Sequence, residues 1–319
     1  MAHEYLESNR HLIFKKYEVT DLINDAESYT NGSGKLNKVL NHYFEELIFE
    51  SCGRSSKTSP MQVLHDDTTV SKIFKYIETK PKFYIGSDIQ NLKSYFRNAV
   101  SWVRKVANFC PKQAKLIQNR FNANGLTLNI LDTSAGFGSR MSAAMLNGHN
   151  YCGIDPNVRL QGKLKELSEF YIENNLAKTK PYLISGGSEV FYSELEGVFD
   201  ISFTSPPYFN LEYYSDDKSA STSNYDNYNE WVYKFVVPTV NNTCKYLKIG
   251  GYAMINIKNL NKKLTLFDNF YNSFKSNAGF EFVEVFDMKI QSKKNYGMAT
   301  GGDISQMESV MVFRKLYNV

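Results

Sequence analysis

From about residue 126 to the C-terminus, short apolar runs alternate with longer segments in which apolar residues recur at helical spacing. Strands that alternate with helices favour an α/β fold, with a mostly parallel sheet covered on both faces. The last two strands have no well-formed helix between them, which favours an antiparallel pair at the sheet edge. The expected strands are 126–131, 150–154, 182–185, 199–204, 251–257, 280–290 and 309–313, and the expected helices are 139–147, 159–175, 230–247 and 267–278.

The residues before this alternation differ in net charge and in apolar spacing, and they predict a separate, mainly helical region. Residues 1–95 carry a net charge of −1, whereas residues 96–319 carry +5. Helices are expected over 37–50, 95–106 and 111–121, and loops over 31–34 and 51–60. We therefore expect an N-terminal region of residues 1–95 and a second domain of residues 96–319.

Composition excludes several classes of protein. With 319 residues, 42% hydrophobic and 22% charged, the chain has the balance of a soluble globular protein. No apolar run approaches the roughly 20 residues that a membrane helix needs, and the polar N-terminus lacks a signal-peptide core. The five histidines show no ligand spacing, so no metal site is predicted. The cysteines are widely spaced, which argues against zinc knuckles and disulfide frameworks and favours a reducing cytoplasm; they are Cys52, Cys110, Cys152 and Cys244.

A turn rich in small residues follows the first strand of the alternating part. Asp132-Thr133-Ser134-Ala135-Gly136-Phe137-Gly138 stands where that strand ends and a helix begins. Glycines at such a turn let the backbone pass close beneath a bound cofactor, at the edge of a parallel sheet where ligands sit. A plain strand-to-helix turn is the alternative, and this motif alone does not decide between them.

Polar segments also follow the second and third strands. Asp155, followed by Pro156, ends the second strand, where an acidic side chain can accept hydrogen bonds from ribose hydroxyls. Its alternative role is to cap the helix that starts near Val158, and both roles could hold at once. After the third strand, Ser188 and Glu189 stand where an adenine ring would lie, although an ordinary glycine-rich turn explains this segment equally well.

The most specific motif closes the fourth strand. Ser205-Pro206-Pro207-Tyr208 follows an apolar run, and two prolines at a strand end stiffen the backbone in one shape. A rigid loop of this type can aim carbonyl oxygens and a hydroxyl at one amino group, and Tyr208 can stack on a planar ring. A generic turn is the weaker interpretation, because the two earlier motifs lie upstream.

Together these motifs resemble the S-adenosylmethionine-dependent DNA amino-methyltransferases, which modify exocyclic amino groups of cytosine or adenine. The resemblance covers roughly residues 108–315 and implies a Rossmann-like class I methyltransferase fold with a mostly parallel seven-stranded sheet. It assigns catalysis to Ser205, Pro206, Pro207 and Tyr208, and S-adenosylmethionine binding to Phe109, Pro111, Asp132, Ser134, Ala135, Gly136, Gly138, Asp155, Pro156, Ser188 and Glu189. The chain departs from many members in the loop, which has Ser-Ala-Gly-Phe-Gly where they have Pro-Phe-X-Gly-X-Gly, and its third-strand motif lacks the Asp that often reads the adenine amino group.

The resemblance implies direct methyl transfer to a base nitrogen. The Ser205 side chain and the Pro206 carbonyl would accept the amino hydrogens, and Tyr208 would stack on a base that has left the duplex. A carbon-5 cytosine methyltransferase needs a cysteine after a proline in this loop, and no cysteine of this chain follows a proline. Within the family, Ser-Pro-Pro-Tyr is more frequent with cytosine-N4 than with adenine-N6 specificity, so we favour cytosine.

The resemblance implies DNA as the partner and suggests that a cognate restriction enzyme exists. Target recognition would then fall to residues 1–95, to the polar aromatic segment 209–228 or to the loop 291–306. That segment either covers a flipped base or forms a mobile surface loop. A group of lysines late in the sequence either contacts phosphates or is merely solvated: Lys258, Lys262, Lys263, Lys289, Lys293 and Lys294. The substrate-contact candidates are Phe209, Tyr213, Tyr214, Lys293 and Lys294. The rival interpretations are an RNA or protein amino-methyltransferase and a catalytically inactive nucleic-acid-binding protein.

Overall fold

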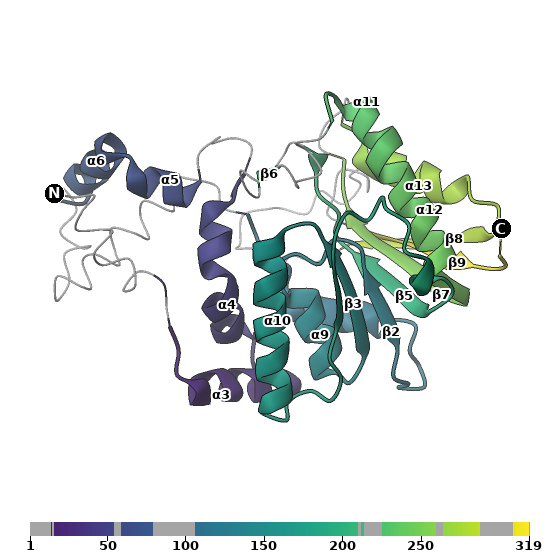
Figure 1. Ribbon diagram of the computed structural model, residues 1–319, viewed down its shortest axis with the longest axis horizontal. Coiled ribbons are helices and arrows are strands. Elements are labelled where there is room, and N and C mark those ends of the chain that lie inside the picture. The colour runs from purple at the N-terminus through teal and green to yellow at the C-terminus, as the bar shows by residue number, and fades with distance from the viewer. Residues whose placement is uncertain are drawn as a thin grey trace. The chain divides into compact units, whose positions relative to one another are not determined.

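The computed structural model describes residues 14, 16–53, 59–78, 106–209, 212–213, 225–259, 264–287 and 309–318 (Figure 1). These residues fall into two compact units. One takes in residues up to 108 together with 210–217, and the other takes in 109–209 and 218–319. The chain therefore leaves the second unit directly after Phe209, one residue beyond the Ser-Pro-Pro-Tyr motif.

The described part of the first unit is mainly helical. Its helices are α3 (Val19–Thr30), α4 (Asn37–Glu50), α5 (Pro60–His65) and α6 (Asp67–Glu78). The predicted helix over 37–50 is confirmed, and it buries Phe44 completely because its apolar residues share one face. Within the expected loop 51–60, however, β1 (Cys52–Gly53) pairs antiparallel with β6 (Glu212–Tyr213). Sequence pattern missed this strand because it is very short and its partner lies far along the chain.

The second unit contains the predicted seven-stranded sheet, in the order β4-β3-β2-β5-β7-β9-β8. Six strands run in one direction, and β9 alone among the seven is reversed, antiparallel to both of its neighbours, β7 and β8. The expected antiparallel pair at the edge is confirmed, and the reversed strand β9 lies between β7 and the edge strand β8. The strands are β2 (Asn129–Asp132), β3 (Asn150–Asp155), β4 (Tyr182–Ser185), β5 (Phe199–Thr204), β7 (Leu247–Ile257), β8 (Phe280–Asp287) and β9 (Ser309–Lys315).

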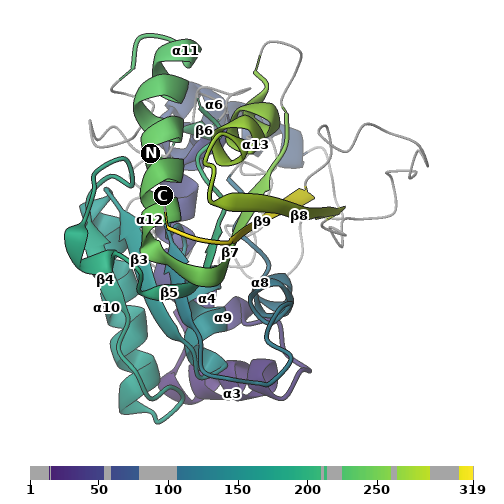
Figure 2. The ribbon, with the colours of Figure 1, turned by 90° about the vertical axis from the view of Figure 1, so that its right-hand side faces the viewer.

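The helices of this unit follow the predicted positions. They are α8 (Pro111–Gln118), α9 (Ser139–Leu146), α10 (Val158–Glu173), α11 (Tyr228–Trp231), α12 (Val237–Tyr246) and α13 (Leu266–Lys275). The expected single helix over 230–247 is interrupted by a π-helical turn, Val232–Val236, which joins α11 to α12. Figure 2 shows α12 and α13 side by side. The predicted helix over 95–106 lies almost entirely outside the described residues.

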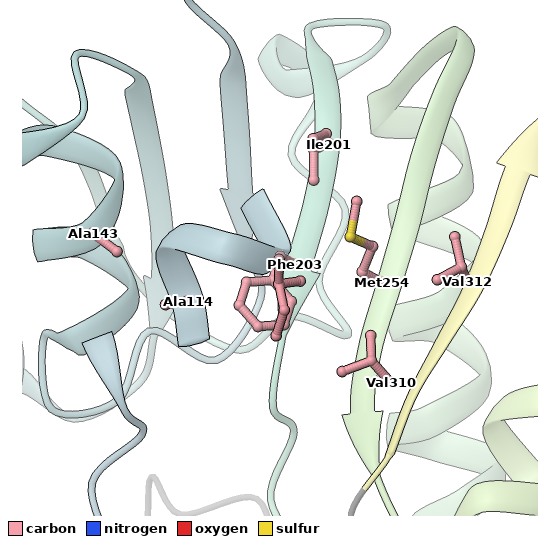
Figure 3. Close-up of a cluster of buried hydrophobic side chains, with 8 residues drawn as sticks. Ala114, Ala143, Ile201, Phe203, Met254, Val310 and Val312 are labelled. Atoms are coloured by element: carbon pink, nitrogen blue, oxygen red, sulfur yellow. The ribbon is translucent and has the colours of Figure 1, made fainter. Parts of the chain in front are cut away.

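Alternate residues of β9 show how helices cover both faces of the sheet. Val310 and Val312 join a buried cluster with Ala114 of α8 and Ala143 of α9 (Figure 3). Phe313 points to the opposite face, where its ring stacks on Phe274 of α13 at a centroid distance of 4.9 Å. The central strands are therefore a buried middle layer, which is why β5 and β9 are largely apolar, whereas the edge strands β4 and β8 are partly exposed.

The strand order also defines where the chain reverses direction across the sheet. From β2 the chain proceeds outward to β3 and β4, then crosses back to β5 on the other side of β2 and continues to β7. The switch point thus lies between β2 and β5, which are adjacent and parallel. In open α/β sheets, ligands bind beyond the carboxyl ends of the strands at such a point.

Candidate active site

The predicted motifs meet at the carboxyl ends of β2, β3, β4 and β5. The Ala135 amide donates to the Ile154 carbonyl at 3.0 Å, which joins the loop after β2 to β3. Gln161 of α10 donates from Nε2 to the carbonyls of Asp155 and Ile184, at 3.0 and 2.8 Å, and so joins β3 to β4. Segments that are far apart in sequence are therefore held together by direct hydrogen bonds at one edge.

The glycine-rich turn depends on two backbone angles. Gly136 and Gly138 have φ values of 57° and 72°, in the left-handed region that disfavours side chains. A Cβ on Gly136 would meet its nearest neighbour only at 3.6 Å, so backbone conformation and not space requires glycine there. The Gly138 amide then closes the turn on the Gly136 carbonyl at 2.9 Å.

Asp132 occupies the base of this turn and is fully buried. Its carboxylate accepts from Arg140 Nε at 2.6 Å, from the Tyr151 hydroxyl at 2.8 Å and from the Thr204 hydroxyl at 2.9 Å. It also accepts from the Ser134 amide at 3.2 Å, and Arg140 donates to the Ser134 carbonyl. The structure therefore places Asp132, one of the predicted cofactor residues, beneath the turn among protein donors. Sequence reasoning missed Arg140 and Thr204 as its partners.

Phe109 and Pro111 precede the sheet, and Phe109 packs against this arrangement. Pro111 is the first residue of α8, where a missing amide hydrogen costs nothing. The Phe109 ring lies edge-on to Phe203 of β5 at 5.5 Å, and the Arg140 guanidinium lies 5.6 Å from the Phe109 centroid. The segment before the first strand is thus attached to the same region as the glycine-rich turn.

Asp155 is half-buried and does not cap the following helix. Asn157 does so, because its side chain accepts from the Leu160 amide at 3.1 Å. Asp155 instead accepts from the amides of Gly136, at 3.2 Å, and Asn157, at 3.0 Å, one on each carboxylate oxygen. Burial raises the pKa of Asp155 to about 6, although these two amides oppose the rise. Each oxygen keeps acceptor capacity for one more donor.

Ser188 and Glu189 differ in what surrounds them. Ser188 is buried, and its hydroxyl shares a hydrogen bond of 3.0 Å with Thr239 of α12. Glu189 is half-buried, and its Oε2 atom is buried without a hydrogen-bond partner among the described residues. Burial and the nearby Glu189 charge both raise the pKa of Tyr192. Glu189 therefore offers an acceptor beyond β4, next to a neutral tyrosine.

The Ser-Pro-Pro-Tyr segment begins directly after β5. Ser205 is half-buried, whereas Pro206 is buried and Tyr208 is only 8% exposed. Asn256 of β7 approaches the Ser205 hydroxyl, with 3.4 Å between Nδ2 and Oγ. Asn256 was not predicted as a site residue; its only signal was a polar side chain near the end of an apolar strand.

Phe209, predicted to contact substrate, lies in a buried aromatic cluster. Its φ of 46° is unusual for a residue with a large side chain. The ring is 5.4 Å from Tyr228 and 5.5 Å from Trp231, centroid to centroid. Trp231 is fully buried, and its indole N–H has no acceptor among the described residues. The cluster therefore packs Phe209, at the end of the Ser-Pro-Pro-Tyr loop, against α11 just before the π-helical turn.

The structure does not describe the side chains of the other predicted substrate-contact residues. Tyr213 belongs to β6, where only its backbone pairing with Cys52 is defined. Tyr214, Lys293 and Lys294 lie outside the described residues. Within the described ranges, no three His, Cys, Asp or Glu side chains group as a metal site would require. No helix in those ranges is long and apolar enough to cross a membrane.

Similarity to known proteins is found among solved structures alone. No protein-family model matches the chain, and no curated protein matches it. Among solved structures, it is similar to TrmN from Thermus thermophilus, at 13% identity and a TM-score of 0.45, over 65% of this chain but only 49% of that one. It is also similar to a SAM-dependent O-methyltransferase from Thermotoga maritima, at 10% identity and a TM-score of 0.42, over 67% and 68% of the two chains. A third similar structure is the N-methyltransferase NodS from Bradyrhizobium japonicum, at 11% identity and a TM-score of 0.42, over 64% and 86% of the two chains.

Proposed function

We propose that this chain is an S-adenosylmethionine-dependent methyltransferase that modifies the exocyclic amino nitrogen of a DNA base, with cytosine-N4 favoured over adenine-N6. One observation carries the proposal. The glycine-rich turn and the Ser-Pro-Pro-Tyr segment follow adjacent parallel strands, β2 and β5, on the two sides of the switch point. A cofactor on the first loop and an amino group on the second would therefore face each other.

The residues at the edge of the sheet fit this cofactor. Asp155 has acceptor capacity left for ribose hydroxyls, and the buried Glu189 Oε2 could accept from the adenine amino group. The positive φ angles at Gly136 and Gly138 keep side chains away from the backbone beneath the ligand. When bound, the cofactor would supply an electrophilic methyl group on its sulfonium sulfur.

The Ser-Pro-Pro-Tyr residues would prepare the accepting nitrogen. An exocyclic base nitrogen is a poor nucleophile because its lone pair is delocalised into the ring. The Ser205 hydroxyl and the Pro206 carbonyl would accept its two hydrogens and favour tetrahedral character at nitrogen. Tyr208 would hold the ring by stacking, which requires that its largely buried face be uncovered when the base enters.

The preference for cytosine rests on the chemistry of Ser205. A serine hydroxyl is a weaker acceptor than the aspartate found at this position in many adenine-N6 enzymes that the motif resembles. Asn256 places a donor 3.4 Å from the Ser205 oxygen, so part of the acceptor capacity of this neutral hydroxyl is already engaged. The base is therefore held by geometry more than by charge.

Mass spectrometry of nucleosides tests the proposal directly. DNA and total RNA from cells that express the chain would be digested and compared with those from cells that express Tyr208→Ala. N4-methylcytosine in the DNA of cells that express the wild type, and only of those, is the expected result. N6-methyladenine would instead show that adenine is the target base. Methylated RNA with unmodified DNA would overturn the DNA substrate. A calorimetric titration with S-adenosylmethionine that detects no binding would overturn the enzyme itself.

A further inference from the structure

We propose that Asp132 is a positioning residue that ties the cofactor-side turn to the catalytic loop, with Arg140 and Thr204 as its partners. The inference rests on the proposed function, because it takes these two loops as the sites of the methyl donor and of the accepting base. It departs from the sequence-based assignment, in which Asp132 contacts the cofactor itself.

Donors reach the Asp132 carboxylate from three elements. Arg140 belongs to α9, Tyr151 to β3 and Thr204 to β5, and all three donate to it within 3.0 Å. With the Ser134 amide and a second bond from Arg140 at 3.3 Å, Oδ1 accepts three hydrogen bonds and Oδ2 accepts two. A carboxylate has about four lone-pair sites. Asp132 therefore has no acceptor capacity to offer a ligand.

The cluster can influence both loops because two of its members immediately precede them in the chain. Asp132 is the last residue of β2 and directly precedes the glycine-rich turn. Thr204 is the last residue of β5 and directly precedes Ser205. One buried carboxylate thus sets the starting points of both loops. Methyl transfer needs reacting atoms about 3–3.5 Å apart and aligned, so a small shift between the loops lowers the rate.

Thr204→Val tests the inference, because it removes the hydroxyl and keeps the shape of the side chain. Ser202→Ala is the matched control. Ser202 lies two residues earlier on the same face of β5, is fully buried, and its hydroxyl has no partner among the described residues. We expect Thr204→Val to lower kcat for methyl transfer about tenfold or more, with the Kd for S-adenosylmethionine within about twofold of wild type. Thr204→Ser should restore most of the rate.

Hydrogen exchange without ligand gives a readout that does not depend on methyl transfer. In Thr204→Val, the amides of Ser134, Gly136, Tyr208 and Phe209 should exchange faster, whereas those in the middle of β5 keep their wild-type rates. A merely structural role of Thr204 would accelerate exchange along the whole strand. Ser202→Ala should change neither set of amides.

The outcomes separate the inference from the proposed function. A wild type that binds no S-adenosylmethionine and methylates nothing overturns the function, and the exchange pattern then decides the inference alone. Wild-type kcat in Thr204→Val, unchanged exchange at both loops, or equal effects of Ser202→Ala and Thr204→Val would each overturn the inference. A slow Thr204→Val with faster exchange confined to the two loops supports it.

Discussion

The loops after β2 and β5 begin at neighbouring strands but are held by different interactions. The turn after β2 stands on the buried Asp132–Arg140 ion pair and on two glycines with positive φ. The loop after β5 contains two prolines and ends at Phe209, whose ring packs among Tyr228 and Trp231. The turn after β2 is thus fixed mainly by buried charge. The loop after β5 shares that charge only at its start, through Thr204, and is otherwise held by stiff backbone and aromatic packing.

The difference suits the two ligands that we propose. Hydrogen bonds to a buried charge define one geometry and lose much energy when distorted, which suits a cofactor that is always the same. Aromatic packing is less directional and can rearrange around another flat ring. The second loop must admit a base beside Tyr208, which is only 8% exposed before it does so.

Removal of the buried charge should have the largest effect. Arg140→Met removes the cationic partner of the buried Asp132 carboxyl, and we expect a loss of about 3–5 kcal/mol in the free energy of unfolding. Denaturant titration followed by circular dichroism measures it. A loss below about 1 kcal/mol would show that the ion pair does not support the turn, and the comparison of the two loops would fail.

An exposed ion pair in the same unit provides the control for that variant. Arg120 and Glu284 form two hydrogen bonds of 2.7 and 2.8 Å, with side chains 40% and 32% exposed. Arg120→Met removes the charge but keeps an apolar stem beside Phe286. We expect it to cost less than about 1 kcal/mol, because solvent screens the pair.

Truncation in the catalytic loop should separate turnover from cofactor binding. We expect Tyr208→Ala and Pro206→Ala each to lower kcat at least about a hundredfold, with calorimetric binding of S-adenosylmethionine retained. Tyr208→Phe keeps the stacking ring and should stay near the wild-type rate. Loss of cofactor binding in both truncations would place this loop in the cofactor site and remove the contrast with the turn.

The pH dependence of cofactor affinity tests whether Asp155, which contacts the turn after β2, binds the ribose of the cofactor. Burial raises the pKa of Asp155 to about 6 in the free protein, above its ordinary value of 3.8. Ribose hydroxyls donate to the ionised form and lower the pKa in the complex. Affinity should therefore be constant above pH 6 and fall by about tenfold for each pH unit below it, until the pKa of the complex is reached.

Stability responds to the same group in the opposite direction. Because the folded pKa lies above the unfolded value, ionisation of Asp155 lowers stability as pH rises from about 4 through 6.

Calorimetric titrations with S-adenosylhomocysteine between pH 5 and 8 measure the affinity, and Asp155→Asn should remove the pH dependence of that affinity. A wild-type affinity that is flat across this range would exclude Asp155 from ribose binding.

The order of strands and helices was predictable because it depends on local pattern. Apolar runs bounded by polar turns gave the strands, and the glycine spacing placed the turn at residues whose φ angles prove positive. One alternative and one local error have physical causes. The alternative that Asp155 caps α10 is decided in favour of Asn157, because the Asp155 oxygens accept from the amides of Gly136 and Asn157. The π-helical turn left no mark in the apolar spacing of 230–247.

Pairwise contacts between distant segments were not predictable from one sequence. Thr204 donates to Asp132 only because β5 lies beside β2, and no spacing rule encodes which strands become neighbours. The role of Asp132 beneath the turn, the aromatic contacts of Phe209 and the pairing of Cys52 with Tyr213 all depend on such neighbours. Sequence motifs therefore located the loops, whereas the interactions that hold them emerged from the sheet.

The smallest expected effect concerns Glu189, whose buried Oε2 accepts no hydrogen bond from the described residues. If this atom accepts from the adenine amino group, Glu189→Ala should weaken S-adenosylmethionine binding by about five- to tenfold, the size of one hydrogen bond. Stability should change by less than about 0.5 kcal/mol, since no bond among the described residues is lost. Glu194→Ala removes a nearby exposed carboxylate and should alter neither quantity. Unchanged affinity in Glu189→Ala would move the adenine away from the end of β4 and leave the turn after β2 as the main determinant of cofactor binding.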